Sequence, residues 1–160
     1  MSSATVAPGN VTGYRCNMKE RLQSDLKAAM KARDSVRLMT IRGILAEITR
    51  VEKETRHEAT DAEIVTVLKR ERARRDEAIG FARQGNRQEL VNQYEAEAKV
   101  LDGYIPAAAG EDEVRAAIDS QIKAGARQIG PIMKALRDQF GTRLDGKMAS
   151  ELIKSALSAA

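Results

Sequence analysis

The sequence predicts an all-α protein, and three observations support that class. Aromatic residues make up only 3% of the 160 residues and tryptophan is absent, so the core must be built from aliphatic side chains. Only three prolines occur, and long stretches contain neither proline nor glycine, which favours helices. Apolar residues recur at helical spacing, and no segment alternates as a half-buried strand does. The hydrophobic fraction of 42% excludes a wholly disordered chain.

Four helices are predicted before Pro106. Asn17 begins a capping-box pattern at the first helix, and Asp34 is a suitable N-cap for the second. Thr60 and Glu63 form a capping box that opens the third helix, which reaches about residue 84. Pro106 pushes the residue before it out of the helical region, so the fourth helix stops there. The other three predicted helices cover residues 18–32, 35–55 and 87–104.

Three shorter helices are predicted after a connector of small residues, 106–110. Gly125 is expected to end the fifth helix of the chain, and Gly141 the sixth. Gly85 likewise suits the left-handed position just past the third helix. Asp145 is placed to cap the last helix. The predicted organisation is a disordered leader over residues 1–16, an N-terminal helical bundle of about four helices over 17–106, and a small C-terminal three-helix domain over 111–160.

Positive charge exceeds negative charge mildly, and the excess lies in the first helices. The chain carries 27 basic and 23 acidic residues, a net charge of +4. The densest basic run contains Lys69, Arg70, Arg72, Arg74 and Arg75. Two interpretations of this run stay open: a solvated helix surface with ion pairs to neighbouring carboxylates, or a surface that meets phosphate or an acidic partner. No aromatic residues are interleaved with it, so base stacking is not expected.

No constellation of residues predicts catalysis, a cofactor or a metal. His57 stands alone in a polar loop, and Glu95, Glu97 and Asp102 are expected to be solvated carboxylates. The sequence contains neither a P-loop nor a dinucleotide-binding glycine motif. No apolar run is long enough to cross a membrane, and residues 1–16 lack the apolar region of a secretory signal. Cys16 is the only cysteine, which fits a reducing compartment, and we expect a cytoplasmic protein.

Six segments follow one another in an informative order and spacing. They are Leu22–Asp34, Val36–Arg42, Arg74–Ile79, Gly85–Leu90, Glu95–Glu97 leading to Leu101–Pro106, and Gln128–Leu136 running on to Leu144–Lys147. Together they resemble the GatB/YqeY family, in its YqeY-like stand-alone branch, from about residue 18 to the end of the chain. The resemblance implies an all-helical protein with an N-terminal helical bundle and a small C-terminal helical domain.

The resemblance also implies a link to tRNA. A related module forms the tail of the B subunit of tRNA-dependent amidotransferases, where it is understood to contact tRNA. Family labels mention carbon–nitrogen ligation with glutamine as amide donor, but the large catalytic domain of those enzymes is absent here. The expected partners are therefore tRNA, and an amidotransferase or another protein. Pro131, Gln139 and Gly141 depart from positions that are often basic in relatives.

We expect a tRNA-associated, non-catalytic adaptor that reads shape and phosphate. Its candidate RNA-binding residues are Lys134, Arg137, Arg143 and Lys147, assisted by Lys154. Two alternatives stay open. One is a protein-interaction module without RNA affinity, and the other is an accessory subunit of a glutamine-dependent carbon–nitrogen ligase.

Overall fold

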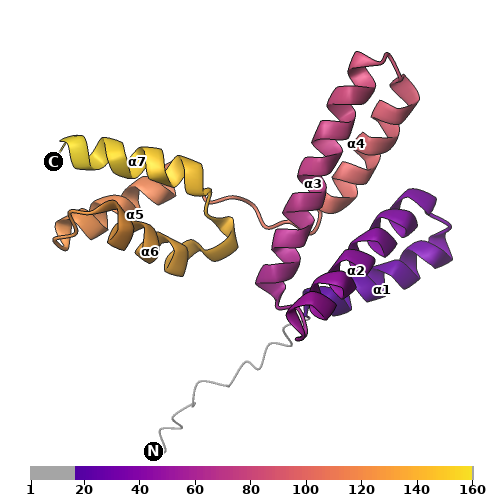
Figure 1. The fold of residues 1–160 in the computed structure, drawn as a ribbon, viewed down its shortest axis with the longest axis horizontal. Helices are drawn as coiled ribbons and strands as arrows, with labels where there is room; N and C mark the ends of the chain where they lie inside the picture. The colour runs from indigo at the N-terminus through magenta and orange to yellow at the C-terminus, as the bar shows by residue number, and fades with distance from the viewer. Residues whose placement is uncertain (1–16, 160) are drawn as a thin grey trace, which may run out of the picture.

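The computed structural model describes residues 17–159, which form two helical units joined by a short connector (Figure 1). These residues contain helices, turns and irregular backbone but no strand, so the all-α prediction is confirmed. The predicted leader, residues 1–16, lies outside the described residues. The helices are α1 (Met18–Ala32), α2 (Ser35–Thr55), α3 (Asp61–Gln84), α4 (Gln88–Asp102), α5 (Glu111–Lys123), α6 (Ile129–Phe140), the 3-10 helix η1 (Gly141–Arg143) and α7 (Gly146–Ala159).

The predicted N-cap residues are found at the starts of their helices. Side-chain oxygens of Asn17, Asp34 and Asp145 each accept a hydrogen bond from a backbone N–H of the first turn. Thr60 and Glu63 bond reciprocally: the Thr60 N–H donates to the Glu63 carboxylate at 2.8 Å, and the Glu63 N–H donates to the Thr60 hydroxyl at 3.3 Å. Local side-chain chemistry therefore fixes where four of the helices begin.

Two helix ends differ from the prediction. The left-handed residue past α3 is Asn86, with φ of 53°, while Gly85 has φ of −83°. Asn tolerates this conformation, and the Arg87 N–H then reaches back to the Ala82 carbonyl at 2.9 Å. The last turn of α4 also ends at Asp102, two residues early, because the Tyr104 N–H bonds to the Leu101 carbonyl three residues back.

Aliphatic side chains build the interior, as the composition predicts. The largest fully buried side chains of the N-terminal unit (residues 17–105) include Leu22, Ile41, Ile48, Ile64, Leu68 and Leu101. Those of the C-terminal unit (residues 109–159) are Val114, Ile118, Ile132, Leu136 and Ile153. Each such side chain contributes roughly 1.5–3 kcal/mol by leaving water. The two sets form separate clusters, and the division into independently folding domains stays a prediction.

Helix α3 is the longest element and lies at the centre of the arrangement (Figure 1). Its first half packs on α1 and α2, and it forms an antiparallel hairpin with α4 whose far end extends beyond α1 and α2. A small satellite cluster of Ile79, Ala82 and Val91 closes that far end. Helix α3 also contacts the C-terminal unit, because its Lys69 donates a hydrogen bond to the carbonyl of Thr142 in η1.

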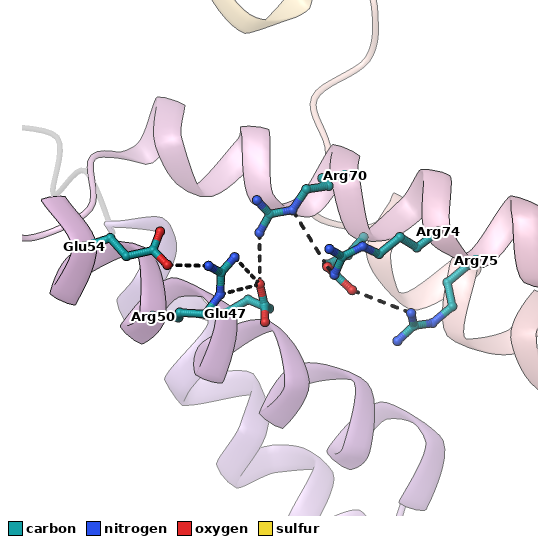
Figure 2. A network of polar contacts seen from close by, with 7 residues as sticks. Glu47, Arg50, Glu54, Arg70, Arg74 and Arg75 are labelled. Carbon is teal, nitrogen blue, oxygen red and sulfur yellow. Dashed lines mark hydrogen bonds and ion pairs between the residues drawn. The ribbon is translucent and has the colours of Figure 1, made fainter.

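A charge network joins α2, α3 and α4, and Figure 2 shows its part on α2 and α3. Its centre is Glu71, a carboxylate only 7% exposed, which lies 2.5 Å from Arg74, 3.6 Å from Arg75 and 4.0 Å from Arg70. Arg70 continues to Glu47 of α2 at 2.9 Å, and Arg75 continues to Glu97 of α4 at 2.6 Å. A buried carboxylate is tolerated only when it is paired, so these arginines are required by the fold.

We predict that Glu71→Gln lowers the free energy of unfolding by about 2 kcal/mol, because three arginines lose their shared counter-charge. Glu77→Gln is the matched control, since Glu77 is on the same helix, is exposed and forms no ion pair within residues 17–159. Urea denaturation followed by circular dichroism measures both, with the control expected within about 0.5 kcal/mol of wild type. Equal stability of the two variants would contradict the structural role of the network.

Candidate functional site

The basic run on α3 is engaged in contacts within the protein. Arg70, Arg74 and Arg75 belong to the Glu71 network (Figure 2). Arg72 pairs with Asp76 and with Asp102, the latter at 2.8 Å, and Lys69 donates to the Thr142 carbonyl. The ion-pair interpretation of this run therefore describes its geometry. Its role toward phosphate stays a prediction, and any such ligand would have to compete with carboxylates that are already in place.

Arg143, one of the five C-terminal candidate residues, forms hydrogen bonds within the protein. The Arg143 guanidinium donates to the Ala107 carbonyl at 3.1 Å and to the Glu113 carboxylate at 3.2 Å. The Arg143 carbonyl in turn accepts from the Ala109 N–H at 2.9 Å. Arg143 thereby fixes the connector against the start of α5, although its side chain remains 44% exposed.

The other four candidates, Lys134, Arg137, Lys147 and Lys154, are exposed and form no ion pair or side-chain hydrogen bond within residues 17–159. Lys134 and Arg137 lie one turn apart on the solvent side of α6, away from the buried Leu136. Lys147 and Lys154 lie two turns apart on the outer face of α7. Glu151 sits between them on that face and lowers the local positive charge.

A polar pocket at the junction of α1, α2 and α4 was not predicted from the sequence. Tyr104, only 5% exposed, donates its hydroxyl hydrogen to Asp25 of α1 at 2.5 Å. The same Asp25 oxygen lies 3.3 Å from the Arg37 guanidinium of α2. The Arg21 guanidinium stacks 4.8 Å from the centre of the Tyr104 ring and donates to the Gly103 carbonyl at 3.1 Å. These contacts join three helices immediately before the connector.

The open space beside Tyr104 has a volume of about 300 Å³. Its lining residues are Arg21, Asp34, Arg37, Lys99, Val100, Gly103 and Tyr104. All of them except Lys99 fall in or next to three of the segments that carry the family resemblance, Leu22–Asp34, Val36–Arg42 and Leu101–Pro106. The resemblance of these three segments to the family was therefore the signal in the sequence that could have indicated the pocket. Their spacing along the chain does not show that they meet in space.

Burial raises the pKa of Tyr104 above its ordinary value, and the hydrogen bond to Asp25 acts in the same direction. The phenol is therefore protonated at neutral pH and remains a donor to Asp25. Because the folded pKa exceeds the unfolded value of about 10, this contribution to stability is complete below that pH. It disappears as the pH rises through the higher pKa of the folded state.

The remaining candidate acids and the histidine do not assemble a reactive centre in the described part of the chain. Glu95 pairs with Arg83 at 2.7 Å, Glu97 pairs with Arg75, and His57 lies exposed at 3.5 Å from Glu63. No group of three or more His, Cys, Asp or Glu residues is placed to hold a metal among residues 17–159. In the same range, every helix is too short or too polar to cross a bilayer.

These features define a helical protein whose basic run on α3 is engaged in internal contacts and whose C-terminal unit carries four exposed cations without a partner within residues 17–159. Residues 19–157 match the family described as Yqey-like protein, and the chain belongs to that family. The predicted resemblance to the YqeY-like branch is confirmed. The match says nothing of tRNA or of amide transfer.

Two fungal relatives share the name "Altered inheritance of mitochondria protein 41, mitochondrial". The protein from Pyrenophora tritici-repentis (strain Pt-1C-BFP) is 30% identical over 164 residues, which covers 98% of this chain and 87% of the relative. The protein from Kluyveromyces lactis is 30% identical over 141 residues, covering 86% of this chain and 75% of the relative. The similarity thus extends over most of this chain and over most of each relative.

We predict that Tyr104→Phe lowers the free energy of unfolding by about 1.5 kcal/mol at neutral pH, because the half-buried Asp25 carboxylate loses the hydrogen bond from the buried phenol. In a titration followed by phenolate absorbance, the wild type should show a step above pH of about 10 that Tyr104→Phe lacks. Tyr94→Phe is the control and should keep both that step and the stability. Loss in Tyr104→Phe of a step at the ordinary pH of about 10, rather than of one above it, would contradict the raised pKa of Tyr104.

Proposed function

We propose that this YqeY-family protein is a non-catalytic helical adaptor that binds tRNA through the C-terminal unit. One observation carries the proposal. Cations of the N-terminal unit's basic run are held by carboxylates or a carbonyl, whereas Lys134, Arg137, Lys147 and Lys154 have no such partner within residues 17–159. A cation without a partner on the protein can meet a phosphate without first breaking an ion pair.

The physical character of this binding follows from the small number of contacts. Each phosphate neutralised by a cation releases counterions, and the logarithm of affinity falls with the logarithm of salt by roughly 0.7–0.9 per contact. Four contacts give a slope of about −3, which means weak binding at physiological salt. Side chains on the outer faces of two helices touch backbone rather than base edges, so recognition is by shape.

We predict that replacing Lys134, Arg137, Lys147 and Lys154 together by Gln weakens tRNA binding at least tenfold at low salt and reduces the salt slope by about three. Titration of tRNA at two ionic strengths measures both effects. The matched control replaces Lys27, Lys31, Arg42 and Lys53, four exposed cations of the N-terminal unit without an ion pair among residues 17–159. It lowers net charge equally and should change affinity less than threefold.

Undetectable binding of tRNA by the wild type at low salt would eliminate the RNA-binding proposal. Equal losses in the two fourfold variants would assign binding to net charge rather than to the C-terminal unit.

A protein-interaction module is the second candidate, because an exposed aromatic side chain lies beside a groove. Phe81 is 72% exposed near the far end of the α3–α4 hairpin. Beside it lies a groove of about 460 Å³, lined by Ala78, Ala82, Gly85, Arg87, Leu90 and Tyr94 as well as Phe81. An exposed aromatic next to a groove is the kind of feature that a partner protein covers.

We predict that partners captured from lysate after nuclease treatment are lost with Phe81→Ser but retained with Met39→Ser. Met39 is the control because it is also a large exposed apolar residue, 65% exposed on α2. Partners that vanish with nuclease alone would favour the RNA adaptor instead.

An accessory role with a glutamine-dependent carbon–nitrogen ligase rests on the family resemblance. The proposed cytoplasmic location rests on the single cysteine.

A further inference from the structure

The pocket beside Tyr104 contains three cations whose hydrogen-bonding capacity is largely unused by the protein. A guanidinium has five N–H donors and a lysine ammonium has three. Arg21 gives one to the Gly103 carbonyl, and Arg37 is paired with Asp25 at 3.3 Å. Lys99 forms no ion pair or side-chain hydrogen bond within residues 17–159. Most of the donors around this pocket therefore remain available for a ligand.

The two carboxylates nearby do not neutralise this set. Asp34 lines the pocket, but one of its oxygens caps α2 by accepting from the Arg37 N–H at 3.0 Å. Asp25 accepts the Tyr104 hydroxyl and balances Arg37. Counting both carboxylates against Arg21, Arg37 and Lys99 leaves a net positive charge. The arrangement differs from the Glu71 network, where carboxylates bridge the arginines (Figure 2).

The pocket is also preorganised. Its floor is the buried Tyr104 ring, and Arg21 is held by that ring and by the Gly103 carbonyl. Arg37 is oriented by Asp25, which is itself fixed by the Tyr104 hydroxyl. Side chains that are held before binding lose less conformational entropy when a ligand arrives. The volume of about 300 Å³ is at the lower end of the range for small-molecule sites.

We propose that this pocket binds the phosphate group of a small molecule. Two guanidinium groups offer the paired N–H donors that fit phosphate oxygens, and a lysine adds a third positive charge. A doubly charged tetrahedral anion uses such a set more fully than a single carboxylate does. The site is independent of the proposed tRNA contacts, because none of the four unpaired C-terminal cations lines it.

The position of the pocket gives the ligand a structural effect. Its wall comes from the end of α4, and the chain then leaves through Ile105 and Pro106 toward the C-terminal unit. A bound phosphate would join α1, α2 and the end of α4 through Arg21, Arg37 and Lys99. Binding to the folded state alone raises the melting temperature by mass action.

The test is a titration of the whole chain with inorganic phosphate at constant ionic strength, with chloride as the balancing anion. Arginine side-chain and tyrosine ring signals are followed by NMR, and the melting temperature is measured in parallel. We expect saturable shifts confined to the pocket, weakened at least tenfold by Arg37→Gln and by Lys99→Gln. Arg42→Gln on α2 and Lys27→Gln on α1, exposed residues without ion pairs among residues 17–159, should stay within twofold of wild type.

Lys99→Gln keeps the test decisive if Arg37→Gln fails to fold, because Lys99 supports no other side chain within residues 17–159. The absence of saturable shifts, the same shifts with chloride alone, or equal losses in the control variants would overturn the proposal. The fourfold C-terminal variant should bind phosphate normally, so the outcome is separable from the tRNA proposal.

Two short RNA oligonucleotides distinguish the possible sources of phosphate. One carries a 5′-terminal phosphate and the other has only internal phosphodiesters. A small-molecule site should prefer the terminal phosphate, which presents more free oxygens and more charge. If the oligonucleotide without a terminal phosphate displaces inorganic phosphate equally well, the pocket reads RNA backbone, and the assignment to a small molecule is overturned.

Discussion

The buried carboxylate of Glu71 is the constraint on which the N-terminal unit depends. A carboxylate only 7% exposed needs compensating positive charge, and Arg74, Arg75 and Arg70 supply it from the same helix. Arg70 also pairs with Glu47 of α2, and Arg75 also pairs with Glu97 of α4. Ion pairs therefore link α3 to α2 and to α4 in addition to the aliphatic core.

The same constraint separates two kinds of cation on the surface. Arginines near α3 stabilise the fold, and replacing them would test stability more than function. Lys134, Arg137, Lys147 and Lys154 on α6 and α7, and Lys99 beside Tyr104, have no carboxylate partner within residues 17–159. These cations can meet a ligand without first breaking an ion pair, although they are a less conspicuous part of the sequence than the run from Lys69 to Arg75.

Local features of the fold were predictable from the sequence, and long-range polar contacts were not. Caps such as Asp34 and Thr60 act within three residues, so spacing alone identifies them. Even here Asn86 took the left-handed position expected of Gly85, because Asn also tolerates a positive φ. Tyr104 and Asp25 are 79 residues apart, and they meet because α1 and α4 both pack on α2. Periodicity shows which face is buried but not which polar groups meet there.

The Tyr104 contacts also connect the two parts of the chain. Tyr104 anchors the end of α4 to α1, and Pro106 follows two residues later, where the connector starts. At the other end, Arg143 bonds to Ala107 and Ala109, and its neighbour Thr142 accepts from Lys69. The connector is therefore held at both ends by polar contacts. A ligand bound beside Tyr104 would therefore act at the end of α4, two residues before the connector starts at Pro106.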